Sequence, residues 1–205
     1  MTLLYSRIFV ISQVDKELYN RAMNLNVGYF EAMKSGDFNC FFFHDVDLLP
    51  EDDRILYTCS DQPRHLSVAI DKFKYALPYK GELLRQMLGQ KYHLNFSEIF
   101  GGASAMTPSQ FKLVNGFSNQ YWGWGGEDDD MYKRIDKSKL KIQRYKADIS
   151  RYGCNYYLGL SETINCRYTM IKHTHEESNK ANPERFNMLK KAEKFQKTDG
   201  LNNLK

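Results

Sequence analysis

The chain has 205 residues, of which 42% are hydrophobic and 14% aromatic, enough to fill one globular core. Lys and Arg exceed Asp and Glu by 29 − 25 = 4 without forming a basic stripe, which argues against a nucleic-acid partner. No apolar run approaches the roughly 18 residues of a membrane span, and the first residues lack the blocks of a signal peptide.

Short apolar segments alternate with helical patterns along the chain. Residues 7–13 are β-branched and aromatic, which predicts a strand, and apolar residues at helical spacing over 16–34 predict a helix. The apolar run 40–43 predicts a buried central strand, and 67–70 and 100–106 are further strand candidates. This alternation favours an α/β fold with a mixed, mainly parallel sheet flanked by helices, in which ligands bind at the carboxyl ends of strands.

Capping residues predict two further helices in the second half of the chain. Thr107 precedes Pro108 at the start of a short helix that ends near Gly116. The pair Asn182-Pro183 opens a last helix, which ends at Gly200.

Two carboxylates follow the strand 40–43. In an extended chain Asp45 and Asp47 leave on the same face, while Val46 points back into the protein. Oxygen ligands at a strand end suit Mg²⁺ or Mn²⁺ bound to a diphosphate. Taken alone, the motif is more simply explained as a solvated turn.

Residues 121–130, YWGWGGEDDD, form the most distinctive loop. Both tryptophans lie two residues apart, the glycines allow close backbone approach, and the acids open a predicted helix. Flat aromatic surface beside carboxylates suits a sugar. The helix dipole explains Asp129 and Asp130 but not Trp-Gly-Trp-Gly-Gly, so we expect a functional loop.

Six segments form a set: HDVDLLP, QPRHLSVAIDKF, FGGASAM, NGFSNQYWGWGGEDDDMYKRI, MIKH and NPERF. In this order, and mostly at this spacing, they resemble the catalytic domain of the animal β-1,4-galactosyltransferase family, particularly invertebrate N-acetylgalactosaminyltransferase-like members. The resemblance implies a Rossmann-like GT-A glycosyltransferase fold.

The resemblance also implies that residues 1–205 are a single, incomplete catalytic domain. This domain is without the family's first strand, nucleotide-contacting segment and membrane anchor. It has insert-like segments at 81–97 and 151–166. We attribute these departures to a mispredicted gene model, which peptide mapping of residues 81–97 would test.

The resemblance implies a metal site, a donor site and an acceptor site. Mn²⁺ would be held by Asp47, Met170 and His173, although the last two alone would be interpreted as a core methionine and a surface histidine. The donor-binding positions are Tyr19, Asn20, Arg21, Val46, Asp47, Ile99, Trp124, His173 and His175. The acceptor-binding positions are Tyr79, Gly102, Gly125, Gly126, Glu127, Asp128, Asp129, Arg185 and Phe186. Asp128 would be the catalytic base, which takes the proton of the acceptor hydroxyl.

The implied reaction is inverting, Mn²⁺-dependent transfer of GalNAc or Gal from its UDP conjugate to O4 of a terminal GlcNAc on a glycoprotein or glycolipid. Ile99 favours UDP-GalNAc, because many vertebrate members have a tyrosine there that crowds the sugar C2 position. The alternative is that Ile99 is only a strand residue. The alternative function is a non-catalytic carbohydrate-binding protein that retains only the acceptor site.

The four cysteines are Cys40, Cys59, Cys154 and Cys166, and none forms a C-x-x-C pair, which disfavours a zinc site. The resemblance implies a disulfide between Cys40 and Cys59, whereas a buried thiol and a loop thiol are the alternative. A disulfide indicates the oxidising secretory pathway. We therefore expect the Golgi lumen, with a type II membrane anchor that this sequence does not contain.

Overall fold

The computed structural model describes residues 5–14, 16–68, 70, 99–145, 168–174 and 176–204. The predictions for Tyr79, His175, 81–97 and 151–166 lie outside these residues. The elements in chain order are α1 (Arg21–Ser35), β1 (Phe41–His44), β2 (Leu48–Pro50), β3 (Arg64–His65), β4 (Ala103–Met106), α3 (Pro108–Leu113), α4 (Glu127–Lys137), β5 (Gln143–Arg144), β6 (Tyr168–Met170), η3 (Glu177–Asn179), α6 (Arg185–Leu189), α7 (Ala192–Phe195) and η4 (Leu201–Asn203).

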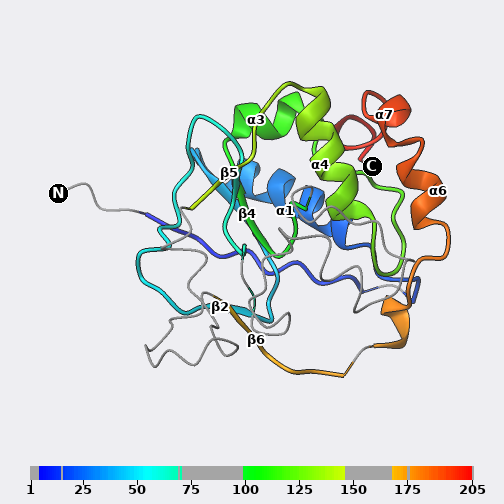
Figure 1. Cartoon of the computed structure of the whole chain (residues 1–205), viewed down its shortest axis with the longest axis horizontal. Coiled ribbons are helices and arrows are strands. Elements are labelled where there is room, and N and C mark those ends of the chain that lie inside the picture. Colours follow the sequence, from blue (N-terminus) through cyan, green and yellow to red (C-terminus); the bar gives the residue numbers. More distant parts are fainter. Residues whose placement is uncertain are drawn as a thin grey trace, which may run out of the picture.

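A four-stranded sheet, in the order β1-β4-β3-β5, separates the helices from a two-stranded ribbon of β2 and β6 (Figure 1). The predicted α/β class and mixed sheet are confirmed. The expectation of mainly parallel pairing is wrong for the described strands, because β1 and β3 both pair antiparallel with β4, and only β3 and β5 are parallel. β1 and β3 lie on either side of β4 and run opposite to it, so β4 has an antiparallel partner on both sides.

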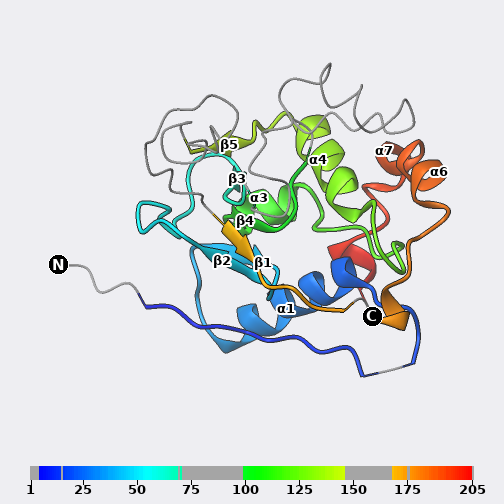
Figure 2. The same ribbon diagram turned by 60° about the horizontal axis from the view of Figure 1, so that its bottom comes forward.

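The predicted strand over residues 7–13 does not form a ladder with any described strand. The segment runs along the outside of α1 (dark blue in Figure 2), where Ile8 is 91% and Val10 78% exposed. Its contacts are side-chain contacts, such as the edge-on packing of Phe9 against Phe38 with ring centroids 6.0 Å apart. β-Propensity yields a strand only where a neighbouring strand pairs the backbone groups, which a helix surface cannot do.

The main core lies between the helices and one face of the sheet. Alternation along β1 turns Phe41 and Phe43 toward α1, α3 and α4. The Phe111 ring of α3 lies 4.6 Å from that of Phe43 and 4.7 Å from that of Tyr29 in α1, measured between centroids. This aromatic cluster brings the helices onto β1 and β4.

A second, smaller core covers the opposite face of the sheet. It consists of Leu48, Ile55, Leu66, Ala103 and Tyr168, with Phe42 of β1 packed against it. These residues hold the β2–β6 ribbon against the sheet.

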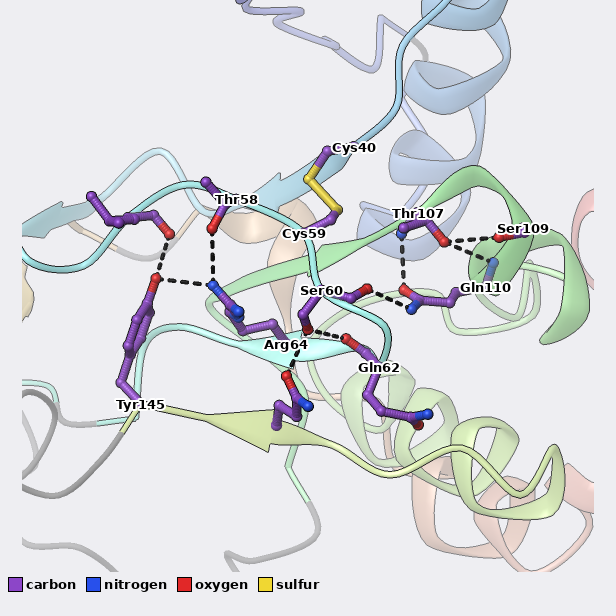
Figure 3. The surroundings of a disulfide bond; sticks show 12 residues. Cys40, Thr58, Cys59, Ser60, Gln62, Arg64, Thr107, Ser109, Gln110 and Tyr145 are labelled. Atoms are coloured by element: carbon purple, nitrogen blue, oxygen red, sulfur yellow. Dashed lines mark hydrogen bonds between the residues drawn. A yellow bond between two sulfur atoms is a disulfide. The ribbon is translucent and has the colours of Figure 1, made fainter. Parts of the chain in front are cut away.

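Cys40 and Cys59 form the predicted disulfide, with their Cα atoms 5.5 Å apart (Figure 3). The neighbouring Ser60 carbonyl accepts a hydrogen bond of 2.9 Å from Gln110 Nε2, which joins this loop to the start of α3. Closing a loop of this length stabilises a fold by roughly 3 kcal/mol in the chain-entropy estimate. The closed loop carries Asp45 and Asp47, so the bond restrains the acidic turn.

Capping explains where the helices begin. Asn20 Oδ1 accepts a hydrogen bond of 2.9 Å from Met23 N, so α1 starts at Arg21 and not at residue 16. The capped helix after Thr107 is confirmed as α3, with a complete capping box between Thr107 and Gln110.

The last predicted helix, 182–200, is divided into α6 and α7. Lys133 Nζ of α4 donates to the Leu189 carbonyl at 2.7 Å, and Lys137 Nζ donates to the Glu193 carbonyl. Between α6 and α7, Lys191 N donates to the Met188 carbonyl at 2.8 Å, three residues back and not four, so the regular helical pattern is interrupted there. No helix in the described part of the chain is long and apolar enough to cross a membrane.

Candidate functional site

Strand β1 ends in a turn that directs two carboxylates apart. Asp45 N donates to the Gly102 carbonyl at 2.9 Å, and Leu48 N donates to the Asp45 carbonyl at 3.3 Å. Val46 is 88% exposed, so the prediction that it points into the protein is wrong. Alternation of side chains holds only in an extended chain, and the turn ends it. Asp45 therefore reaches Arg21, whereas Asp47 reaches His173.

Arg21, the first residue of α1, gathers three carboxylates. Its Nε donates to Asp45 Oδ1 at 2.7 Å, and its Nη1 donates to Asp128 Oδ1 at 2.9 Å. Nη1 also lies 3.6 Å from Glu127 Oε1. Burial opposes the charge of Arg21, but Asp45, Asp128 and Glu127 outweigh it and raise its pKa well above the ordinary value. Arg21 therefore stays charged and joins the β1 turn to α4.

Asp128 lies in the first turn of α4, pressed against a glycine loop. A Cβ on Gly101 would overlap Oδ2 of Asp128, so only glycine allows the carboxylate this position. Burial raises the pKa of Asp128, Arg21 lowers it and Asp45 raises it, with a net increase. The side chain remains 25% exposed. A partly accessible carboxylate with a raised pKa suits proton acceptance from a ligand.

Glu127, the residue before Asp128, has a more deeply buried carboxyl group. Its Oε2 is buried and has no hydrogen-bond partner among the residues the structure describes. Burial and, next, Asp128 raise the pKa of Glu127 to about 7, against the opposing effect of Arg21. The carboxyl thus changes protonation near neutral pH.

We expect the stability of the wild-type chain to fall, relative to a Glu127→Gln variant, as the pH rises from 4.5 to 8. The folded-state pKa is raised, so the folded chain binds the extra proton. The protonated carboxyl contributes fully to the free energy of unfolding below pH 4.5, the pKa of Glu127 in the unfolded chain. This contribution is lost as the pH rises past about 7, the pKa in the folded chain. The relative change is about 3 kcal/mol at most. Urea unfolding of both proteins across this pH range measures the change. If the free energies of unfolding of wild type and Glu127→Gln depend on pH in the same way, the raised pKa is contradicted.

Strands β2 and β6 bring two of the three predicted metal ligands, Asp47 and His173, together, whereas Met170 packs against the second core. Leu48 faces Met170 in their antiparallel register, and Ile171 N donates to the Asp47 carbonyl at 2.7 Å. His173 Nε2 lies 3.2 Å from Asp47 Oδ2. His173 Nδ1 lies 3.0 Å from the Thr174 carbonyl, to which it can donate, so Nε2 is the ring nitrogen that faces Asp47. A carboxylate and an imidazole nitrogen this close can bind one cation together.

This donor set fits a manganese ion that also binds substrate. The carboxylate and imidazole suit Mn²⁺, whereas the thioether of Met170 is a softer partner. Among the described residues, no group of three or more His, Cys, Asp or Glu side chains could hold a metal ion. Asp47 and His173 therefore need further ligands, and phosphate oxygens of a nucleotide are the usual ones for such ions.

Trp124, Arg185 and Phe186 form an exposed platform beside the acids. Trp124 N donates to the Lys180 carbonyl at 2.8 Å, which ties the tryptophan loop to the segment before α6. The Arg185 guanidinium lies 4.5 Å from the Phe186 ring centroid and 5.7 Å from that of Trp124. Trp124 is 55% and Phe186 45% exposed, so flat apolar surface faces solvent. Such a surface beside carboxylates can bind a sugar ring.

The other predicted positions near the platform are mainly backbone supports. Gly125 and Gly126 have φ angles of 99° and 103°, and a Cβ on Gly125 would lie 3.0 Å from Arg185 Cδ. Tyr19 holds the loop through its carbonyl, which accepts from Gly123 N at 2.7 Å. Asp129 is partly exposed next to Asp128.

Two predicted donor-site residues, Asn20 and Ile99, and one predicted acceptor-site residue, Gly102, have different outcomes. The Asn20 side chain caps α1 and is 1% exposed, so it has no surface for a donor. Ile99 is partly buried, and its carbonyl accepts from Arg144 Nη2 at 3.0 Å. Gly102 has a φ of 73° and packs on Ser67, whose Oγ a Cβ on Gly102 would overlap.

Asp130 serves the fold and not the open site. It is 2% exposed, pairs with Arg134, and accepts from Tyr121 OH at 3.1 Å. Arg134 also contacts Asp199 Oδ2 at 3.2 Å, near the end of the chain. The helix-dipole explanation of Asp130 was incomplete, because this buried network anchors α4 and thus Asp128.

Sequence reasoning missed two groups. The pairing of Asp45 with Arg21 depends on a turn that the D-V-D pattern does not reveal. The buried residues His65 and Ser67 and the partly buried Arg144 contact the loop 99–102, and the QPRHLSV segment signalled only the first two.

Comparisons with known proteins cover most of the chain. Residues 2–60 match the N-terminal region of glycosyl transferase group 7, and residues 82–156 match the N-terminal domain of galactosyltransferase. β-1,4-Galactosyltransferase 4 of Rattus norvegicus is 44% identical over 194 residues, which cover 95% of this chain and 47% of that protein. β-1,4-Galactosyltransferase 2 of Homo sapiens is 42% identical over 199 residues, which cover 97% of this chain and 45% of that protein. The chain spans about half the length of these curated relatives.

Two solved structures share the fold. Both are of Drosophila β-1,4-galactosyltransferase 7. The catalytic domain with xylobiose has a TM-score of 0.61 and 27% identity, covering 93% of this chain and 67% of that one. A mutant in complex with manganese, UDP-Gal and xylobiose has a TM-score of 0.63 and 28% identity, and the match covers 96% of this chain and 69% of that one. With its GT-A fold and these relatives, the chain belongs to the β-1,4-galactosyltransferase family.

Proposed function

We propose that this chain is an inverting, Mn²⁺-dependent transferase that moves GalNAc or Gal from its UDP conjugate to O4 of a terminal GlcNAc. One observation carries the proposal: Arg21 joins Asp128 to Asp45, two residues before Asp47, which faces His173. A candidate base is thus linked to a pair of candidate metal ligands. The Drosophila neighbour described with manganese and UDP-Gal supports this metal and donor class.

The chain's own residues suffice to orient the acceptor and receive its proton. The acceptor ring packs on Trp124 and Phe186, and Asp128 takes the O4 proton as that oxygen attacks the anomeric carbon. The new O4–C1 bond forms while the bond from C1 to the UDP oxygen breaks on the opposite face, which inverts C1. Arg21 favours the ionised form of Asp128. Manganese held by Asp47, Met170 and His173 supplies positive charge for the diphosphate.

A transfer assay tests this function. The purified chain receives Mn²⁺, UDP-Gal or UDP-GalNAc, and a GlcNAc-terminated acceptor, with xylobiose as a comparison acceptor and EDTA as the metal-free control. We expect transfer that EDTA abolishes. Binding of the acceptor without transfer would favour the non-catalytic carbohydrate-binding protein, and release of free sugar would indicate donor hydrolysis.

We expect the wild-type chain to prefer UDP-GalNAc, and Ile99→Tyr to shift the preference toward UDP-Gal by at least about tenfold. Tyrosine adds bulk and a hydroxyl where isoleucine leaves room for a 2-acetamido group. Initial rates with each donor give the ratio, and Ile99→Leu is the matched control, because it keeps an apolar side chain of the same size. An unchanged ratio in Ile99→Tyr would remove Ile99 from donor selection.

We place the protein in the Golgi lumen. The Cys40–Cys59 disulfide supports an oxidising compartment. A type II membrane anchor in a longer form of the protein belongs to the same proposal. Microscopy of the full-length protein with a Golgi marker tests both.

A further inference from the structure

Three polar side chains, two of them buried and the third partly buried, lie behind the glycine loop of the site. They are His65 on β3, Ser67 just after it, and Arg144 on β5, and we refer to them as the loop anchor. We propose that the loop anchor positions residues 99–102, and through them Asp45 and Asp128, for sugar transfer. This inference rests on the proposed function and adds three positioning residues to it.

The hydrogen bonds of His65 define its tautomer. Its Nδ1 lies 3.2 Å from Arg144 Nε, which can only donate, so Nδ1 is an acceptor. The ring proton is therefore on Nε2, which donates to the Gly101 carbonyl at 2.9 Å. Burial and Arg144 lower the pKa of His65 to about 3, so the ring stays neutral at working pH. It acts as a fixed donor and not as an acid or base.

Ser67 contacts the same carbonyl, and its Oγ lies 3.5 Å from His65 Nε2. Its Oγ donates to the Gly101 carbonyl at 3.0 Å and accepts from Ala103 N at 2.7 Å. The Gly101 carbonyl thus receives two hydrogen bonds, and the backbone on both sides of Gly102 is held by one serine. His65 is 3% and Ser67 4% exposed, so water cannot replace these contacts without rearrangement.

Arg144 extends the anchor to the residue that we assign to donor choice. It donates Nη2 to the Ile99 carbonyl at 3.0 Å, while its Nε holds His65. The β3–β5 register places Arg144 beside His65. The Arg144 guanidinium therefore holds the start of the loop at Ile99 and also holds the His65 ring, which binds the middle of the loop at Gly101.

The anchored loop in turn contacts two of the three acids around Arg21, a group that we call the Arg21 cluster. The Gly102 carbonyl accepts from Asp45 N at 2.9 Å. Gly101 lies so close to Asp128 Oδ2 that a Cβ would overlap it. A shift of this loop therefore changes where Asp128 sits relative to the acceptor, and small misplacements of a catalytic group cost large factors in rate.

The anchor is tested with His65→Phe, which keeps a ring but removes both hydrogen bonds. We expect kcat to fall about 30-fold, with less than threefold change in acceptor KM and in the affinity for UDP with Mn²⁺. His65→Gln, which restores a donor, should recover most of kcat. Val114→Ala, in the buried core beside α3, is the matched control that lowers Tm without changing kcat.

Ser67→Ala provides a double-mutant cycle with His65→Phe, because both residues donate to one carbonyl. We expect the two losses in kcat to be non-additive. Amide hydrogen exchange at Asp45 and Ala103 should also accelerate at least tenfold in His65→Phe and not in Val114→Ala. This second readout needs no turnover.

The outcomes separate the two hypotheses. Unchanged exchange at Asp45 and Ala103, or kcat of His65→Phe within twofold of wild type, would overturn the loop anchor. A wild-type chain without transfer, in which exchange still responds to His65→Phe, would overturn the proposed function and leave the anchoring of the loop intact. If Val114→Ala and His65→Phe have the same Tm and lose the same factor in kcat, the effect of His65 is purely structural and the proposal is overturned.

Discussion

Asp128→Asn should lower kcat by about a thousandfold while leaving the affinity for UDP with Mn²⁺ within threefold of wild type. Asparagine has nearly the same shape, and its carbonyl oxygen can still accept from Arg21 Nη1, which donates to Asp128 Oδ1 at 2.9 Å. It cannot accept the proton of the acceptor hydroxyl at neutral pH. Steady-state transfer rates and calorimetric titration of the nucleotide measure the two effects separately.

Asp136→Asn is the matched control for this variant. Asp136 is an exposed acid on the same helix, α4, and removing its charge should leave kcat unchanged. Transfer by Asp128→Asn within tenfold of wild type would remove Asp128 as the base. Loss of nucleotide affinity together with kcat would instead show that the substitution disturbs the Arg21 cluster.

Arg21→Met should have the second largest effect, since it removes the cation shared by Asp45, Asp128 and Glu127. The free energy of unfolding should fall by about 2 kcal/mol or more, below the cost for a wholly buried pair because Asp45 and Asp128 keep some solvent access. Arg21 lowers the pKa of Asp128 and Glu127, so both values rise further without it. Because the base must be ionised, the acidic limb of kcat/KM moves to higher pH.

Chemical unfolding and the pH profile of kcat/KM measure these effects. Arg21→Lys keeps the positive charge without the forked geometry, so it should retain a pH profile close to wild type with a lower rate. Lys34→Met, at the exposed end of α1, controls for the loss of one charge. An acidic limb that stays in place in Arg21→Met would show that Arg21 does not set the ionisation of Asp128.

Local patterns were enough for several elements. Thr107-Pro108 and Gln110 predict α3, because a capping box satisfies the first backbone groups of a helix wherever it occurs. The acids at 127–130 begin α4 as predicted, and the phenylalanine run 41–43 is a buried strand. The disulfide between Cys40 and Cys59 followed from the family resemblance and not from spacing.

Residues 7–13 and Val46 show where local patterns fail. The first segment has strand propensity but no neighbouring strand in the described structure, and propensity alone does not pair a backbone. Val46 was placed by alternation, which the turn between Asp45 and Leu48 interrupts. Both outcomes depend on partners distant in sequence.

The amino-acid sequence was sufficient for the α/β class, because composition and periodicity indicate it, and for the family, because its motifs carry the resemblance that implied the site residues. Only the tertiary structure decided that Arg21 binds both Asp45 and Asp128, and that His65, Ser67 and Arg144 hold the loop 99–102. The physical reason is that hydrogen bonds between separate elements depend on the packing of α1, α4, β3 and β5 around the sheet, which no local pattern specifies.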